Sequence, residues 1–514
     1  MKFIAKLLLI FVIAIPCSVR CQTVELTVND IKWSLASSVR AFEPQRIAVN
    51  LAENYFSDTF SYGMIQLEDH SVISRVQLDK HNYGMVRLNK DLTVKWLNTL
   101  DLGGRHFLFN GKLLVIISTL SPDGSDYVYK LTIIDPETGN VVSTKDLITV
   151  NGEFLTDASF LVSPDSKSLK LVVRTSGVPL RGNLLMNLSM NKNIIAFNNT
   201  TDFKIIEFDS NLNIKSTVKP QLEQGDFIGA AMDNKQNVYI MSMYSQGMVK
   251  MAKYGNGETK PARVLQLPVN MSDKINSEGT QRFLIRSKYN PDIYYFVTMY
   301  DNANNERELV VASFDFKNGL AKSDVQVMDK AYLKNLTKSY IPFSKKFDDI
   351  YLGDKFGTRI DNIIETDGKL IVAISGSSNA SLPDHYPYYH GHDVIFNIYD
   401  DKANLQYQQI IPRQYSTFRP DLMGVGLHCT DNVLYVTMNS GKHLNETEVL
   451  FGKINLKTGL ISDITFVPKD DINHKYEMDP TASIWYDNKV ILSYLEIKGW
   501  SAGSEDAHMQ LVGY

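Results

Sequence analysis

Cysteine is almost absent from this chain. Its 514 residues include only three cysteines, Cys17, Cys21 and Cys429. The first two lie in an N-terminal segment that we expect to be removed, which leaves Cys429 alone in the mature chain. A single cysteine excludes an intrachain disulfide and any zinc site with two cysteine ligands. Stability must therefore come from burial of apolar surface, which a chain of this length can supply.

The N-terminal segment has the pattern of a secretory signal. Lys2 and Lys6 precede an apolar run over residues 7–15 that is too short to span a bilayer as a helix. The residues before Gln22 fit signal-peptidase cleavage. We therefore expect a signal peptide over 1–21, a single domain over 22–514, and a secreted, periplasmic or cell-surface location. Lipid attachment at Cys17 is the alternative, which the preceding proline disfavours.

Charged residues are also few, at 21% of the chain, and the formal net charge is -4. Loss of segment 1–21, which carries three positive charges and no acid, lowers the net charge to about -7. A mildly acidic chain is a poor partner for nucleic acid or an anionic membrane surface. No later run of about 18 apolar residues predicts a membrane span. The 44% hydrophobic content excludes disorder, collagen and coiled coil.

A two-strand unit recurs seven times along the chain. In each copy an alternating apolar strand ends at Asp, Asn or Gly, and a short polar turn leads into a second strand. The copies span residues 85–96, 130–142, 203–214, 248–257, 309–320, 394–405 and 449–460. Asp or Asn closes the first strand by bonding its own backbone two residues on. We expect Gly or Asn to take the positive φ of each turn.

Two more short strands precede most of these hairpins. Examples are 227–232 with 238–243, 361–364 with 369–373, and 427–429 with 433–437. Four strands per unit, with closely spaced turns, are typical of a β-propeller blade. We therefore predict an all-β fold, a β-propeller of eight four-stranded blades. Seven blades is the alternative if residues 48–101 do not form a blade of their own.

The two ends of the chain supply the eighth blade. Residues 482–486, 490–494 and 508–514 look like the first three strands of a blade that has no fourth. Residues 24–33 alternate as a strand with no hairpin partner nearby. We expect this N-terminal strand to complete the last blade as its outer strand, because that closes the ring and removes an open edge.

The hairpins at 86–96 and 132–142 resemble the repeats of the PQQ-like propeller superfamily. That superfamily includes eight-bladed quinoprotein dehydrogenases and a non-enzymatic outer-membrane assembly scaffold. The turns at 121–124 and 163–166 are similar to those of TolB-like and WD-type propellers. The quinoproteins end each blade in a tryptophan that packs on the next blade, and here only Trp96 holds that place. The resemblance implies the fold, and this departure argues against PQQ as a cofactor.

A histidine-rich loop over residues 383–393 is the main candidate site. His390 and His392 are two residues apart, so on an extended strand they point the same way and could share a divalent metal with Asp393. Without a metal, we expect the same loop to contact a ligand on one face of the disc. Packing of its rings on neighbouring blades is the structural alternative. The candidate ligand-binding residues are His385, Tyr386, Tyr388, Tyr389, His390 and His392.

Three other motifs favour structural explanations. Residues 499–503 match the G-x-S-x-G pattern of a hydrolase nucleophile, but too little chain follows for a hydrolase domain. The runs 209–213 and 301–306 have calcium-like oxygen spacing, yet both lie at expected turns. Cys429 lies in an expected inner strand, which predicts a buried, inert thiol.

The sequence thus predicts a fold more sharply than a function. Apolar insertions at 174–201 and 329–360 favour a non-catalytic, exported propeller that binds a protein or glycan partner through face loops. One alternative is a propeller enzyme, a hydrolase or lyase acting on a glycan or small ester, with a His/Asp site at the channel mouth. A second is a cell-envelope assembly scaffold. No cofactor is expected, with a divalent metal as the exception.

Overall fold

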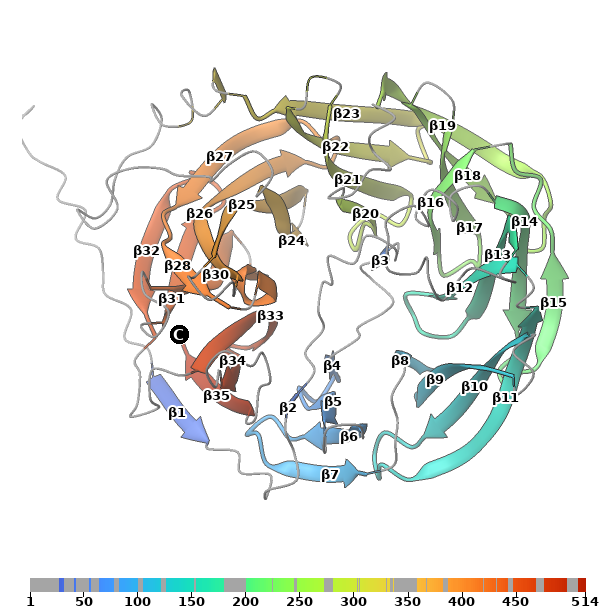
Figure 1. Ribbon diagram of the computed structural model, residues 1–514, viewed down its shortest axis with the longest axis horizontal. Coiled ribbons are helices and arrows are strands. Elements are labelled where there is room, and N and C mark those ends of the chain that lie inside the picture. The colour runs from blue at the N-terminus through green and yellow to red at the C-terminus, as the bar shows by residue number, and fades with distance from the viewer. Residues whose placement is uncertain are drawn as a thin grey trace, which may run out of the picture.

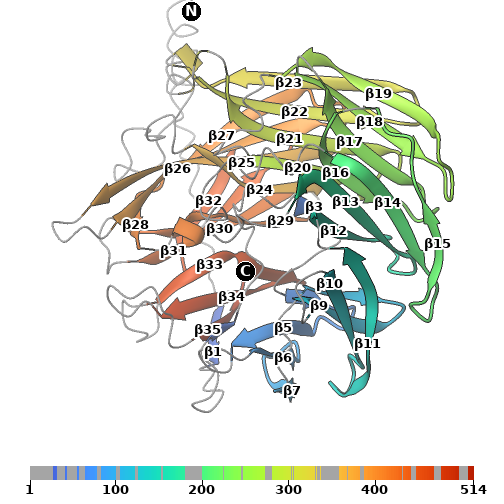
Figure 2. The same cartoon turned by 45° about the vertical axis from the view of Figure 1, so that its right-hand side comes forward.

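The computed structural model describes most of the chain and resolves it into strands arranged as a ring (Figures 1 and 2). The described residues are 27–31, 41–42, 55–56, 64–77, 83–99, 105–121, 126–151, 154–179, 200–223, 225–244, 247–271, 281–302, 304, 306–329, 331–332, 336, 358–366, 368–381, 387–418, 420–430, 432–441, 447–467, 476–496 and 507–514. No helix in these ranges is long and apolar enough to cross a membrane.

Eight separate sheets make up the ring, and each is one blade. Blade 1 is β4 (Met64–Gln66), β5 (Val72–Gln77), β6 (Tyr83–Leu88) and β7 (Val94–Asn98). Blade 2 is β8 (Arg105–Phe109), β9 (Lys112–Leu120), β10 (Asp126–Ile134) and β11 (Val141–Asn151). Blade 3 is β12 (Phe154–Val162), β13 (Leu169–Pro179), β14 (Thr200–Phe208) and β15 (Ile214–Val218). Blade 4 is β16 (Asp226–Met232), β17 (Val238–Tyr244), β18 (Met248–Tyr254) and β19 (Pro261–Asn270).

The second half of the ring repeats the same order. Blade 5 is β20 (Gln281–Arg286), β21 (Ile293–Asp301), β22 (Arg307–Asp315) and β23 (Leu320–Val327). Blade 6 is β24 (Arg359–Thr366), β25 (Lys369–Ser381), β26 (Pro387–Asp400) and β27 (Leu405–Ile411), and the short β28 (Tyr415–Thr417) also pairs with β26. A 3-10 turn, η3 (Pro420–Met423), leads into blade 7, which is β29 (Gly426–Thr430), β30 (Val433–Ser440), β31 (Glu448–Asn455) and β32 (Ile461–Phe466).

Blade 8 closes the ring by joining the two ends of the chain. It consists of β33 (Tyr476–Tyr486), β34 (Lys489–Glu496), β35 (Ala507–Gly513) and the N-terminal β1 (Thr27–Ile31). β1 runs antiparallel to β35, from Thr27 opposite Gly513 to Ile31 opposite Met509. The predicted closure and the count of eight are both confirmed, and residues 64–98 form the blade on which that count depended.

All seven repeated hairpins are the third and fourth strands of a blade. The prediction that Gly or Asn takes the positive φ in these turns is confirmed only in part. Gly139, Gly257, Gly319 and Gly459 have φ between +70° and +77° in four of the seven turns. In three others that conformation falls on the apolar residues Leu92, Leu212 and Ala403.

Burial explains those three apolar turn residues. Leu92, Leu212 and Ala403 are each at most 3% exposed in the core. The left-handed conformation costs roughly 1–2 kcal/mol for a non-glycine residue. Burying a leucine side chain returns about 1.5–3 kcal/mol, which offsets that strain at Leu92 and Leu212, whereas the single methyl group of Ala403 returns less.

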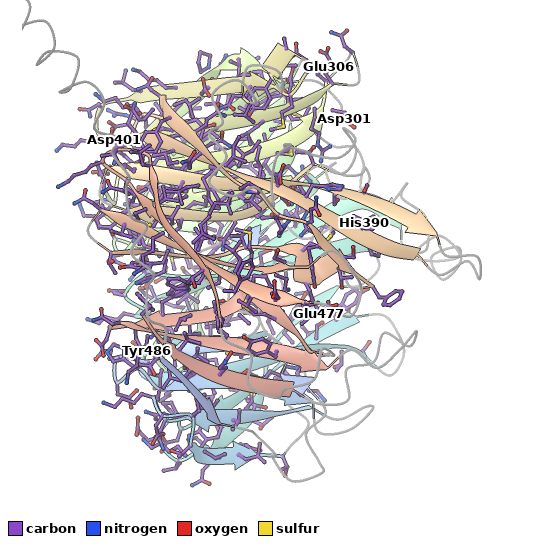
Figure 3. The ribbon with its side chains drawn as sticks, turned by 90° about the vertical axis from the view of Figure 1, so that its left-hand side faces the viewer. Asp301, Glu306, His390, Asp401, Glu477 and Tyr486 are labelled. Carbon is purple, nitrogen blue, oxygen red and sulfur yellow. The ribbon has the colours of Figure 1, made fainter. Side chains whose placement is uncertain are left out.

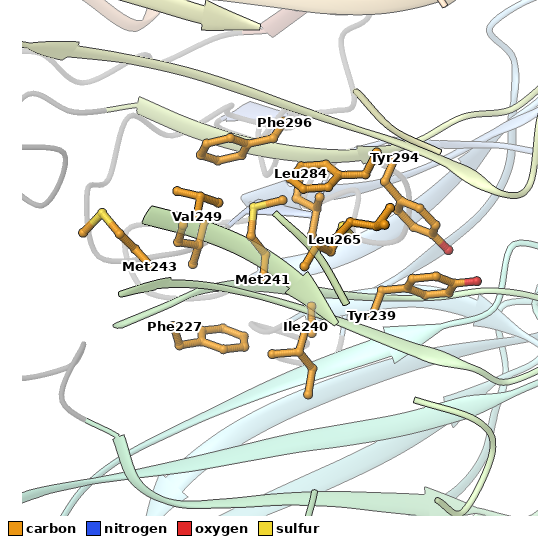
Figure 4. Packing of buried hydrophobic residues seen from close by; sticks show 14 of the residues in the cluster. Phe227, Tyr239, Ile240, Met241, Met243, Val249, Leu265, Leu284, Tyr294 and Phe296 are labelled. Atoms are coloured by element: carbon orange, nitrogen blue, oxygen red, sulfur yellow. The ribbon is translucent and has the colours of Figure 1, made fainter. Parts of the chain in front are cut away.

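The core lies between neighbouring blades. On β17, Ile240 points toward blade 3 and Met241 toward blade 5, where it meets Leu284 and Phe296 (Figure 4). Residues 238–243 are all buried, because both faces of this sheet are covered. This explains why inner strands have nearly continuous apolar sequences instead of a polar–apolar alternation.

Trp96 joins blade 1 to blade 2. Its indole Nε1 donates a hydrogen bond to the Pro136 carbonyl at 2.9 Å. A Cβ built on Gly139 would lie 2.5 Å from the indole ring, so the glycine is what lets the ring lie flat on the turn. Trp96 therefore packs blade on blade, as its place in the repeat implies.

Other side chains take the same role at later interfaces. Arg263 of blade 4 donates to the Phe316 carbonyl at 2.5 Å, and Tyr407 of blade 6 donates to the Leu456 carbonyl at 2.7 Å. The Tyr407 ring also lies against Gly459, as Trp96 lies against its glycine. Each accepting carbonyl belongs to the residue just after the Asp or Asn that ends or directly follows a third strand. At these two interfaces, a planar donor on the outer strand takes the place of tryptophan.

The two faces of the ring differ in their connections. Because neighbouring strands are antiparallel, the second and fourth strands of every blade run toward one face. The segments that follow β13, β23 and β25 therefore begin on that face. Figure 3 shows His390 and Glu477 on this side, which we call the hairpin face. Asp401 and Tyr486 lie on the opposite side, which we call the turn face.

Two further short strands lie at the inner edges of blades. β2 (Ala41–Phe42) pairs with β5, beside β4. β3 (Tyr55–Phe56) pairs with β20 and is parallel to it, with Tyr55 opposite Phe283 and Phe56 opposite Leu284. In Figure 1, β3 lies on the axial side of β20.

Candidate functional site

The β25–β26 hairpin projects from the hairpin face beyond its own blade (Figures 2 and 3). β24 pairs with β25 only as far as Ser375. Beyond a register shift at that point, β25 and β26 continue to pair from Ser377 opposite Gly391 to Ser381 opposite Pro387. β28 braces this extension, because its three residues pair with residues 389–391 of β26.

The predicted ligand-binding residues are distributed along this hairpin. His385 and Tyr386 lie outside the described residues. Tyr388 is in β26 opposite Ala380, and Tyr389, which is half-buried, lies opposite Asn379. Within the described residues, the outermost pair of the hairpin is Ser381 of β25 and Pro387 at the start of β26.

His390 and His392 are each paired with a serine hydroxyl. His390 Nδ1 lies 2.8 Å from Ser416 Oγ on β28, and His392 Nε2 lies 2.9 Å from Ser378 Oγ on β25. Ser378 is also the residue directly opposite His390 in the ladder. Cross-strand partners share a face of a sheet, so the two imidazoles and two hydroxyls form one polar row.

Asp393 takes part in a different set of contacts. The residue is 3% exposed, and its Oδ1 accepts a hydrogen bond from the backbone N–H of Arg413 at 2.8 Å. Among the described residues, no group of three His, Cys, Asp or Glu side chains is arranged to hold a metal ion. A divalent metal on His390, His392 and Asp393 stays a prediction.

Arg413 fixes the base of the hairpin. Its guanidinium is completely buried; Nε donates to the His392 carbonyl at 3.0 Å and Nη1 to the Met423 carbonyl at 2.7 Å. Burial lowers the pKa of Arg413 to about 10, and the nearby Asp361 carboxylate opposes that shift. The side chain stays charged at neutral pH and joins β26 to η3. Gly391 leaves room for it, since a Cβ there would lie 3.2 Å from Nη2.

Glu477 anchors β28 to blade 8. It is 3% exposed at the start of β33, and its Oε2 accepts hydrogen bonds from Tyr415 Oη at 2.6 Å and Thr417 Oγ1 at 2.5 Å. Burial and the adjacent carboxylate raise the pKa of Tyr415 well above its usual value, so the phenol remains a donor. Asn439 of blade 7 adds hydrogen bonds to the backbone of Met478. The brace therefore reaches across blade 7.

Sequence reasoning missed Arg413, Tyr415 and Glu477. The three-residue β28 is too short to show a period, and Glu477 lies in a different blade. The signal that was present is a Tyr-Ser-Thr run shortly after a strand, which on its own is typical of a loop. What the arrangement offers chemically is a rigid two-stranded surface with imidazole and hydroxyl groups, held in place by buried charges.

The remaining motifs have structural explanations where the structure describes them. Asp209 Oδ1 accepts the N–H groups of Asn211 and Asn213, and Asn302 Oδ1 accepts those of Asn304 and Glu306, so both calcium-like runs are hydrogen-bonded turns. Burial raises the pKa of the Cys429 thiol to about 12, which makes it a poor nucleophile. The Gly499–Gly503 motif lies outside the described residues.

Comparisons with known proteins bear on the fold only. No protein-family model and no curated protein matches the chain. The WD40 domain of SCAP from fission yeast is similar with a TM-score of 0.36 and 10% identity, over 92% of this chain and 97% of that one. The propeller domain of the Trilobed protease from Pyrococcus furiosus is similar at 0.37 and 10%, over 77% and 97%. A GH43_1 enzyme from Xanthomonas citri is similar at 0.25 and 11%, over 55% and 90%.

At these scores the likenesses say nothing about activity. The assignment rests on the strand order of the chain itself, with eight sheets in sequence order and a closing N-terminal strand. The fold is a β-propeller.

Proposed function

We propose that this protein is an exported, non-catalytic binding propeller whose hairpin face takes up a protein or glycan partner. The observation that carries the proposal is the braced β25–β26 hairpin, which extends past blade 6 and is held by Arg413 and Glu477. A projection that only packed within its blade would not need a brace reaching two blades away. The long insertions leave from the same face, where propellers place variable loops.

The test compares the two faces. Wild-type protein, His385→Ala/His390→Ala/His392→Ala and the control His70→Ala are screened on a glycan array and against surface proteins of the native source. His70 is a matched control because it stacks on Tyr486 of the turn face, with ring centroids 5.3 Å apart. Loss of binding in the triple variant alone supports the proposal. Equal binding by all three proteins places the partner elsewhere and contradicts it.

A second candidate function, hydrolysis of a small ester, rests on the two Ser–His contacts. A serine hydroxyl within hydrogen-bond reach of an imidazole is the arrangement of an activated nucleophile. Labelling with a fluorophosphonate probe tests it, because the probe reacts only with an activated serine. A probe adduct on Ser378 or Ser416 that is lost in His392→Ala or His390→Ala, respectively, favours the enzyme over the binding protein.

Metal binding and a scaffold role need separate tests. Elemental analysis, with the effect of a chelator on the melting temperature, examines a metal on His390, His392 and Asp393, since a bound ion stabilises the folded state by mass action. Affinity purification from the cell envelope examines the scaffold, which requires a stoichiometric complex and not a transient one.

A further inference from the structure

Among the described first strands of the blades, β20 is the longest that pairs with its second strand without a register shift. β12, β16, β24 and β33 each contain a register shift against their second strand. β20 pairs with β21 at six consecutive positions without a shift, whereas the regular β8 and β29 have five. Bulges protect sheet edges from unwanted pairing. β20 has no bulge against its second strand, as is also true of the shorter β4, β8 and β29.

The chain itself already uses part of this edge. β3 adds to β20 as a parallel strand, but it covers only Phe283 and Leu284. A strand that pairs at only two positions is held weakly against its neighbour. The side chains of Phe283, Leu284 and Ile285 are buried between blades, so what the edge offers to a further strand is mainly backbone donors and acceptors.

The sequences of the two strands are complementary in charge. On β20, Arg282 and Arg286 flank the apolar centre 283–285. In the N-terminal segment, Glu53 and Asp58 flank the Tyr55–Phe56 pair. Of this segment, the described aromatic pair Tyr55–Phe56 is what pairs with the edge in the folded chain.

We propose that the axial edge of β20 is a strand-acceptor site, occupied within the chain by β3, which receives an extended segment of a protein partner with an apolar centre and acidic flanks. A longer segment is expected to bind more tightly than β3, because it can pair along all six residues of β20, whereas β3 pairs along two. Main-chain hydrogen bonds give the affinity in this mode, and the flanking arginines give the preference. The inference is independent of the hairpin face.

The experiment uses full-length protein and a synthetic peptide with the sequence of residues 52–59. Tyr55→Pro/Phe56→Pro removes the two N–H groups of β3 and frees the edge. Fluorescence anisotropy is expected to show at least about tenfold tighter peptide binding to this variant than to wild type, because the tethered β3 competes in wild type. Hydrogen exchange at residues 281–286 is expected to rise in the variant and to fall again with peptide.

Two controls keep the result decisive. A peptide with Glu53→Lys and Asp58→Lys tests the charge preference, and Tyr55→Gly/Phe56→Gly repeats the release of β3 without proline. Equal binding of both peptides, or exchange at 281–286 that neither variant changes, overturns the proposal. Loss of hairpin-face binding in the histidine variants does not affect this result, so the two proposals fail separately.

Discussion

Single glycines decide how closely neighbouring blades approach. Gly139 combines a φ of +72° with a Cβ position 2.5 Å from the Trp96 ring, whereas Gly257 has a φ of +77° with open space around it. We predict that Gly139→Ala lowers the free energy of unfolding by about 2–4 kcal/mol, because backbone strain and overpacking add. Gly257→Ala is expected to cost only about 1–2 kcal/mol, since strain acts alone.

Urea denaturation of the two glycine variants measures the difference. An equal decrease in the free energy of unfolding for both variants would mean that the Trp96 indole moves aside without destabilising the fold. That result would contradict the close packing between blades 1 and 2.

One histidine makes the stability of the interface between blades 7 and 8 depend on pH. His428 stacks on Trp485 with ring centroids 5.3 Å apart and planes at 5°. Burial, and secondarily the positive charge of Lys288, lowers the pKa of His428 below its ordinary value. The unfolded chain therefore takes up the proton first as the pH falls, so this contribution is complete above the unfolded pKa and is lost on acidification.

We predict that acidification from about pH 7.5 to about pH 5.5 destabilises the wild type more than His428→Gln, which cannot titrate. The measurement is the urea midpoint of both proteins at the two pH values. Parallel changes would show that other groups carry the pH dependence of stability.

At the scale of elements, the turns depend on buried apolar residues as well as on glycine. Leu92 has a φ of 68° and is fully buried, while Val94, two residues later, is 42% exposed. We predict that Leu92→Ala lowers the free energy of unfolding by about 2–4 kcal/mol, because it leaves a cavity. Val94→Ala is the control and is expected to change it by less than about 0.5 kcal/mol. Similar effects from thermal or urea unfolding would contradict the explanation of the strained leucine.

Strand positions were predictable from sequence for a local reason. A turn flanked by two apolar strands specifies a hairpin without any distant contact, which is why all seven hairpins were found. The residue that takes positive φ was not predictable for Leu92, Leu212 and Ala403, because the compensating burial comes from other strands. Tyr407 and Arg263 were missed as interblade contacts for the same reason, since their partners lie in the next blade.

At the scale of the whole molecule, β1 is the strand that closes the ring. Replacing residues 27–31 by a Gly-Ser sequence removes its pairing with β35 and exposes that edge. We predict a fall of at least about 5 °C in the melting temperature, together with self-association. Calorimetry and size-exclusion chromatography measure both effects, with Asn29→Ser as the control that keeps the strand. An unchanged melting temperature would show that the ring is stable without this closure.

The candidate site was predictable only in part. His390 and His392 stand out by composition and spacing, and both are in the projecting hairpin. Their serine partners lie on β25 and β28, and the groups that hold the base, Arg413 and Glu477, come from segments with no local pattern. Tertiary pairing alone brings these residues together.

The sequence by itself determined the repeated hairpins, the eight blades and the pairing of the two chain ends, because turn chemistry and strand alternation are local and repeat along the chain. Only the tertiary structure decided which side chains join the blades, how the hairpin is braced and which inner edge accepts β3. Those features depend on contacts between segments that are distant in sequence, where burial and geometry outweigh local preference.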